Sequence, residues 1–271
     1  MNIFISADIE GIAGVMRKEQ CSSGNVEYQL ARGLMEQEVN AAIDGAFRGG
    51  ATRVVVADSH AQMVNLRAEN IDQRAHLIQG KPRSLSMIDG LEQQRFDGLI
   101  CIGFHTAAGE KGVLAHTINS RAFWQVIING QVMGETDIYA AAAAECNTPL
   151  LLVSGDDHLQ QWVTNHYPQT GYACVKRAIS NTAAESLSPQ ASRELIAHSV
   201  EQAVKRGERV VSRRITPPFQ LELRVMNPLL ADIYSLIPGV TRQDGVTVSY
   251  RATTMKQLIG LLSTLSYLAA A

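Results

Sequence analysis

Short apolar runs that alternate with helical segments constrain the fold of this chain more than any other feature. The runs cover 2–7 (NIFISA), 53–57 (RVVVA), 98–104 (GLICIGF) and 149–154 (PLLLVS), and the second is β-branched. Between the first two runs, apolar residues recur at helical spacing from Tyr28 to Phe47, and a Gly-Gly pair follows. Buried strands separated by helices predict an α/β fold with a mainly parallel, doubly wound sheet and helices on both faces.

The last hundred residues follow a different pattern. Residues 219–225 (FQLELRV) and 246–250 (VTVSY) alternate between apolar and polar side chains, which predicts half-exposed, antiparallel strands. The final helix, expected over 255–268, is apolar on more than one side and should be buried or lie at a subunit interface. We therefore predict an α/β domain over residues 1–164 and a smaller α+β domain over 165–271 that takes part in oligomerisation.

The composition narrows the classes of protein to consider. The 271 residues are 46% hydrophobic and 18% charged, with a net charge of −2, which allows a large core and argues against a nucleic-acid partner. No apolar stretch is long enough to span a bilayer, and the first residues do not resemble a signal peptide. The four cysteines are widely spaced. We therefore expect a cytoplasmic protein with reduced thiols and no membrane partner.

Acids and histidines follow the predicted strands, where ligands bind in open α/β sheets. Asp8 and Glu10 end the first run, His60 follows the second, and His105 follows the third. Asp8 and Glu10 are two residues apart, so an extended backbone would point both carboxylates the same way. Because paired carboxylates repel one another unless a cation or a proton intervenes, the pattern favours a metal site.

A fifth ligand is expected from a predicted hairpin. Asn129-Gly130 lies between WQVII and QVMGE, which is typical of a tight turn, and an alanine-rich helix follows over about 137–145. Glu135 stands between the hairpin and the helix and can reach the same edge of the sheet.

The number of candidate ligands indicates two ions rather than one. Asp8, Glu10, His60, His105 and Glu135 exceed the three protein ligands of a single catalytic zinc site. Two divalent ions that share one carboxylate would use all five ligands and leave positions open for water. Mixed carboxylate and imidazole ligands suit zinc best, and manganese or cobalt less specifically. Taken singly, each residue could instead cap a helix or be a structural side chain.

His116 is a candidate catalytic residue in the loop 106–122. It could be a surface histidine, or a group that transfers protons above the ions, because histidine titrates near neutral pH. Asp58, Asp156 and Asp157 could orient the ligand histidines or act as simple caps.

The motifs SADIEGIAGV, VVVADSH, GFHTAAGEKGVLAHT and INGQVMGE resemble the zinc-dependent D-aminopeptidase family, peptidase family M55, along the whole chain. The resemblance implies two zinc ions bridged by Asp8. By the same match, Glu10 and His105 are ligands of one ion, and His60 and Glu135 of the other. His116 matches the residue proposed in the family as nucleophile or base, and a decameric homo-oligomer is implied.

These patterns lead to one expected function and two alternatives. The expected function is an aminopeptidase that uses metal-activated water to release N-terminal D-amino acids from short peptides. The first alternative is a two-metal hydrolase of another amide or of a phosphoester, which the same ions could serve. The second is a metal-binding scaffold without catalysis. Against a phosphate substrate, the sequence has no P-loop and no arginine cluster near the ligands.

Overall fold

The predicted doubly wound sheet is confirmed in the computed structural model, which describes residues 1–207, 210–212 and 214–269. The sheet has seven strands in the order β3-β2-β1-β4-β7-β8-β9, and all neighbouring strands are parallel except β8 and β9. The strands are β1 (Asn2–Ala7), β2 (Arg53–Asp58), β3 (Ala75–Ile78), β4 (Gly98–Ile102), β7 (Leu150–Asp156), β8 (Gly171–Ser180) and β9 (Ala183–Ser186).

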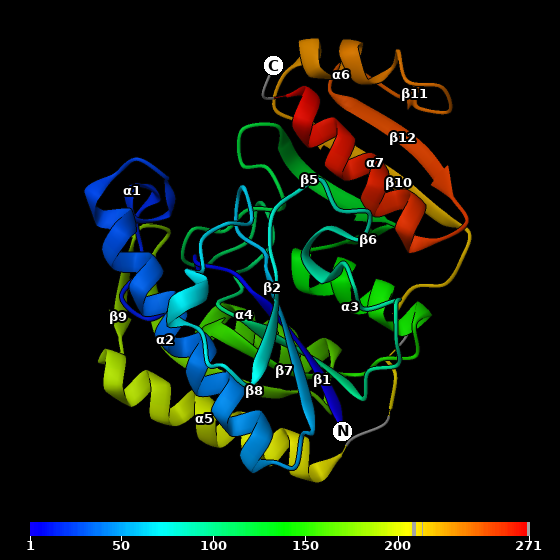
Figure 1. The fold of residues 1–271 in the computed structure, drawn as a ribbon. Helices are drawn as coiled ribbons and strands as arrows, with labels where there is room; N and C mark the ends of the chain where they lie inside the picture. The colour runs from blue at the N-terminus through cyan, green and yellow to red at the C-terminus, as the bar shows by residue number, and fades with distance from the viewer. Residues whose placement is uncertain (208–209, 213, 270–271) are drawn as a thin grey trace.

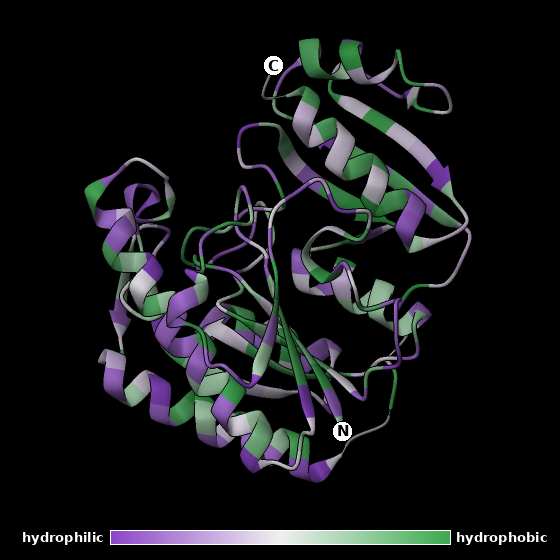
Figure 2. Cartoon of the chain, viewed as in Figure 1, coloured by the Kyte–Doolittle hydropathy of each residue, from purple (hydrophilic) through white to green (hydrophobic). Residues whose placement is uncertain are grey.

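Helices cover both faces of this sheet (Figure 1). One face carries α2 (Val26–Arg48) and α5 (Pro189–Arg206), and the other carries α3 (Glu135–Glu145) and α4 (Asp157–His166). Strand β1 contributes side chains to both cores, because successive residues of a strand point to opposite faces. Ile3 and Ile5 pack in the core beneath α2, and Phe4 packs in the other core. The central strands are therefore largely hydrophobic along their length (Figure 2).

A second sheet of five strands contains the predicted hairpin and the two alternating segments. Its order is β11-β12-β10-β5-β6, and every neighbouring pair is antiparallel. Strand β10 buries every second residue, as its alternating sequence predicts. The strands are β5 (Phe123–Ile128), β6 (Gln131–Val132), β10 (Phe219–Val225), β11 (Thr241–Arg242) and β12 (Thr247–Ala252), with the helices α6 (Pro228–Tyr234) and α7 (Met255–Leu268).

The two sheets do not divide the chain at residue 165. Strands β8 and β9 follow that position and belong to the seven-stranded sheet, whereas β5 and β6 precede it and belong to the five-stranded sheet. One continuous core joins residues of both sheets, including Phe4 of β1 and Leu223 of β10. In the described part of the chain, no helix is long and apolar enough to cross a membrane.

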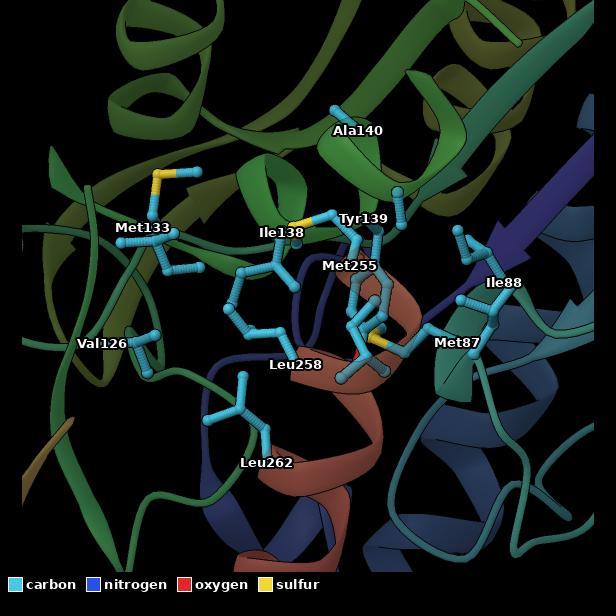
Figure 3. Close-up of a cluster of buried hydrophobic side chains, with 14 of the residues drawn as sticks. Met87, Ile88, Val126, Met133, Ile138, Tyr139, Ala140, Met255, Leu258 and Leu262 are labelled. Carbon is cyan, nitrogen blue, oxygen red and sulfur yellow. The ribbon is translucent and has the colours of Figure 1, made fainter. Parts of the chain in front are cut away.

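Helix α3 is held in place by the packing of its apolar side against α7 and the short 3-10 helix η2 (Ser86–Ile88). Ile138 and Tyr139 of α3 meet Leu258 and Met255 of α7, as Figure 3 shows. All four side chains are buried. This packing fixes the position of Glu135, which is the first residue of α3.

Candidate metal centre

The five predicted ligands lie together at the carboxyl end of the seven-stranded sheet. Asp8 directly follows β1, while His60 and His105 follow its two neighbours, β2 and β4. In the strand order, β2 and β3 extend from one side of β1 and the later strands from the other. The site therefore lies at the point where the order of the strands reverses, as expected for a ligand site in such a sheet.

Two glycines allow the segments after β1 and β4 to run in direct contact. The amide of Gly11 donates a hydrogen bond of 2.7 Å to the carbonyl oxygen of Gly103. A Cβ atom on Gly11 would lie 2.1 Å from the carbonyl oxygen of Phe104, and a Cβ on Gly103 would lie 2.2 Å from that of Asp8. Only glycine fits at either position, and the contact brings Asp8 and Glu10 close to His105.

The carboxylate of Asp8 lies between two histidines. Its Oδ1 atom is 3.2 Å from Nδ1 of His60, and its Oδ2 atom is 3.5 Å from Nε2 of His105. Glu10 approaches the first of these histidines, with 3.0 Å between Oε2 of Glu10 and Nδ1 of His60. Each oxygen of Asp8 thus faces a different imidazole, as expected of a carboxylate that bridges two ions.

Glu135 lies on the His105 side of the site. Its Oε1 atom is 3.6 Å from Nε2 of His105 and 4.0 Å from Nε2 of His116. The same oxygen accepts a hydrogen bond of 2.6 Å from the amide of Ile118. Because Ile118 belongs to the loop that carries His116, Glu135 ties this loop to the ligand cluster.

Each of the three histidines has one ring nitrogen beside a main-chain carbonyl oxygen and the other beside a carboxylate. The Nε2 atom of His60 is 2.7 Å from the carbonyl oxygen of Cys21, and Nδ1 of His105 is 3.0 Å from that of Thr106. The Nδ1 atom of His116 is 2.8 Å from the carbonyl oxygen of Leu114. A carbonyl oxygen only accepts, so each of these nitrogens carries the hydrogen. In a neutral ring the second nitrogen then offers a lone pair, and in each histidine it faces the carboxylates.

The site fits a metal ion by its burial and its unsatisfied atoms. The five predicted ligands are each at most 8% exposed. The Oε2 atom of Glu10 and the Nε2 atom of His105 are buried, and neither makes a hydrogen bond of regular geometry, although each lies beside an oppositely charged partner within ion-pair distance. A buried polar atom without a partner is costly, and a cation between these groups would satisfy both. One ligand atom each of Asp8, Glu10 and His105 lie within 4.8 Å of one another, as do those of His105, His116 and Glu135.

The ionisation of these groups reflects their mutual proximity. Burial alone would lower the pKa of His105, but the negative charges of Glu135 and Asp8 raise it to about 10. Burial alone would likewise lower the pKa of His60, yet Glu10 and Asp8 raise it well above its ordinary value. In the metal-free protein His60 and His105 therefore hold protons that balance the carboxylates. A bound cation would take the place of these protons.

The three aspartates considered as partners for the histidines have other roles. Asp58 accepts hydrogen bonds from the amides of Asn65 and Leu66 and so organises the loop after His60. Main-chain carbonyls, rather than acids, orient the ligand histidines.

Asp156 caps α4, where its Oδ1 accepts from the amide of Leu159, and its Oδ2 accepts from the amide of Val113 in the His116 loop. Asp157 accepts from the amide of Ala178. The cap interpretation is thus the one that fits Asp156.

The geometry allocates the ligands differently from the family resemblance. Nδ1 of His60 lies beside Asp8 and Glu10, while Glu135 lies beside His105. The resemblance implies instead that His60 shares an ion with Glu135. No ion pair or hydrogen bond between His60 and Glu135 occurs among the described residues, which favours the first grouping for these two residues. Glu10 also lies near His105, as the resemblance implies, because one ligand atom each of Asp8, Glu10 and His105 lie within 4.8 Å of one another.

Sequence reasoning missed Lys176, a buried residue of β8 whose ammonium group contacts the segment after β1. Its Nζ atom donates to the carbonyl oxygen of Glu10. In the sequence this lysine stands in the run CVKRAIS, where a charged residue suggests a solvent-facing strand position. No local pattern marks it as buried.

Comparisons with known proteins identify the family of this chain. The family model of the D-aminopeptidases, peptidase family M55, matches residues 1–264. A D-aminopeptidase of Bacillus subtilis (strain 168) is 33% identical over 260 residues, which cover 94% of this chain and 93% of that protein. A solved structure described as the Zn-dependent D-aminopeptidase DppA from Bacillus subtilis, a self-compartmentalizing protease, superposes with a TM-score of 0.95. It is 30% identical, and the match covers all of this chain and 98% of that one. The chain therefore belongs to the D-aminopeptidase family, M55.

Proposed function

We propose that this chain is a zinc-dependent aminopeptidase that holds two zinc ions and releases N-terminal D-amino acids from short peptides. Family membership and a relative described as Zn-dependent support the metal and the class of reaction. The observation that carries the two-ion centre is the position of Asp8, whose two carboxylate oxygens face two different histidines.

Asp8 would bridge the two ions, and each ion would have two further ligands. Glu10 and His60 would hold one ion, because Nδ1 of His60 lies within 3.2 Å of both acids. His105 and Glu135 would hold the other ion. Three carboxylates would offset three of the four positive charges, which suits a buried pair of divalent ions.

When bound, a zinc pair supplies Lewis acidity toward a scissile carbonyl and toward water. The protein supplies orientation and proton transfer. His116 is 19% exposed at its side chain, unlike the deeply buried ligands, so its ring can meet a substrate. Its Nδ1 hydrogen is directed to the carbonyl oxygen of Leu114, which leaves Nε2 to accept a proton and later to donate it to the departing amine.

The proposal includes a homo-oligomer in the cytoplasm, with a decamer as the expected number. The relative described as a self-compartmentalizing protease supports assembly. Large apolar side chains around α6 also support it: Leu229 is 65% exposed and Leu236 is 82% exposed in the single chain. Such side chains are commonly covered by a partner. Residues 165–271 would thereby contribute to assembly, as the sequence predicts.

Metal removal and a substrate panel test the proposed function. The full-length protein is treated with a chelator, dialysed, and assayed before and after zinc is restored. The substrates are a dipeptide with N-terminal D-alanine, its L-alanine counterpart and a phosphomonoester. We expect hydrolysis of the D-peptide to disappear with the metal and to return with about two zinc ions per chain.

Three results would contradict the proposal in different ways. Peptide hydrolysis that survives complete metal removal would eliminate the metal mechanism. Full activity with one zinc ion per chain would eliminate the second ion. Preferential hydrolysis of the L-peptide or of the phosphomonoester would move the function to another substrate class.

A further inference from the structure

Lys176 is a buried cation bound to main-chain oxygens of the segment that carries two of the proposed ligands. The residue lies in β8 and is 3% exposed. Its Nζ atom donates three hydrogen bonds, of 2.5 Å to the carbonyl oxygen of Glu10, 3.0 Å to that of Ile12 and 2.6 Å to that of Val15. All three ammonium hydrogens are thus directed at a single stretch of six residues.

This arrangement is unusual for a buried lysine. Charged groups inside proteins are normally paired with an opposite charge, because burial of an isolated ion is costly. Among the described residues, Lys176 takes part in no ion pair with a carboxylate. Three carbonyl dipoles solvate its charge instead. The carbonyl oxygens of Glu10 and Val15 have no other hydrogen-bond donor among the described residues, whereas that of Ile12 also accepts from the amide of Val15.

A second buried side chain, Glu38, also holds the main chain of this segment. The Oε1 atom of Glu38 in α2 accepts hydrogen bonds of 3.0 Å from the amide of Ala13 and 2.6 Å from the hydroxyl of Ser192 in α5. Glu38 therefore holds the amide of Ala13, which lies in the sequence between the two carbonyls of Ile12 and Val15 that Lys176 holds. Among the described residues, Lys176 alone donates a hydrogen bond to the main chain of Glu10.

We propose that Lys176 is a positioning residue of the metal centre, which fixes the backbone of Glu10 so that its carboxylate faces His60. The inference rests on the proposed two-ion function. The position of a carboxylate ligand depends on the position of its own backbone. The two further bonds, to Ile12 and Val15, hold the residues that follow Glu10 and so limit rotation of the segment. Loss of the ammonium would leave the buried carbonyl oxygens of Glu10 and Val15 unpaired, and the backbone of Glu10 would no longer be held in place. Groups that orient metal ligands typically change metal affinity about 10–100-fold when they are removed.

A selective effect on one ion distinguishes positioning from general stabilisation. The test uses the full-length wild type, Lys176→Met, and Leu223→Ala as a control in the five-stranded sheet, which supplies none of the proposed ligands. Leu223 is fully buried, so its truncation should destabilise the protein by about 2–5 kcal/mol without contact with the site. Zinc affinity is measured by competition with a chelating dye, and unfolding of the metal-free proteins is measured by urea.

We expect Lys176→Met to weaken one of the two zinc ions by about tenfold or more, while the second ion binds as in the wild type. Leu223→Ala should lose stability and keep both affinities. If Lys176→Met does not fold, Lys176→Gln replaces it, because its amide retains two of the hydrogen-bond donors.

Equal zinc affinities in the lysine variant and the wild type would overturn the positioning role, even if the variant were less stable. An equal loss at both ions, matched by Leu223→Ala, would also overturn it. Failure of the proposed function is distinguishable, because it is seen in the wild type alone, as an absence of two-zinc binding or of D-peptide hydrolysis.

Discussion

The imidazole rings of His105 and His116 stack on each other, with 4.1 Å between their centroids and 10° between their planes. Both rings direct Nε2 toward Oε1 of Glu135, at 3.6 Å and 4.0 Å respectively. They differ in burial, because the side chain of His105 is 1% exposed and that of His116 is 19% exposed. The stacked pair thus combines a buried ring suited to a metal with an accessible ring suited to a substrate.

Replacement of His116 should separate catalysis from metal binding. We expect His116→Asn to lower kcat for D-peptide hydrolysis by about 10²–10⁴-fold, because a positioned proton-transfer group is lost. Zinc content, measured by elemental analysis, should stay at the wild-type level. His198→Asn, at an exposed position of α5, is the matched control and should leave both quantities unchanged. Loss of one zinc ion from His116→Asn would instead identify His116 as a ligand of the His105 ion.

The allocation of ligands predicts different metal losses for different variants. His60→Ala should release the ion held with Glu10, and Glu135→Gln should release the ion held with His105, since each removes one ligand of one ion. Asp8→Asn should weaken both ions, because Asp8 faces both histidines. Zinc per chain after dialysis against a weak chelator measures these losses. A double variant, His60→Ala with Glu135→Gln, that still held one zinc ion would show that both residues bind the same ion, as the family resemblance implies.

The ligand residues can be predicted from the sequence more fully than the long-range contacts that position them. Strand ends are visible as the residues that follow short apolar runs, and in a parallel sheet all such ends meet at one edge. Asp8, His60 and His105 could therefore be brought together from sequence alone, and the structure does bring them together. Glu135 required a tight-turn signal as well, which the Asn129-Gly130 pair supplied.

Long-range partners could not be predicted in this way. Lys176 and Glu10 are 166 residues apart, and nothing near either residue indicates the other. The carbonyl oxygens of Cys21 and Thr106 orient the ligand histidines. Every residue has a main-chain carbonyl, so the sequence does not show which ones take this role. The pairing of β10 with β5 likewise depends on the tertiary fold, because alternating apolar and polar residues predict a strand but not the strand with which it pairs.

Gly11 should be intolerant of any side chain because its segment contacts the main chain after β4. In Gly11→Ala the new Cβ would lie 2.1 Å from the carbonyl oxygen of Phe104, so the segment with Glu10 must move. We expect a loss of about 1–3 kcal/mol in the free energy of unfolding, together with weaker zinc binding. Gly33→Ala is the matched control, because its Cβ would meet only Arg67, at 3.7 Å, within a helix. Normal zinc affinity in Gly11→Ala would refute this role for the close contact.

Glu38 should make the stability of the metal-free protein depend on pH. Burial raises the pKa of Glu38 to about 7, from an ordinary value of 4.5, and its Oε2 atom has no hydrogen-bond partner. Between these two values the folded state binds more protons than the unfolded state, so the free energy of unfolding falls as pH rises. Glu38→Gln cannot titrate. Relative to the wild type, the stability of Glu38→Gln should therefore rise by about 3 kcal/mol across this window.

Urea unfolding of the two zinc-free proteins at intervals from pH 5 to pH 8 checks this expectation. Glu36→Gln is the control on the same helix. Burial alone would raise the pKa of Glu36, but hydrogen bonds from Arg67 lower it below 4.5. Glu36 therefore stays ionised above pH 5, and its variant should differ from the wild type by a constant amount. A constant difference for Glu38→Gln as well would mean that Glu38 is ionised in the folded protein throughout this range, stabilised by Ala13 and Ser192.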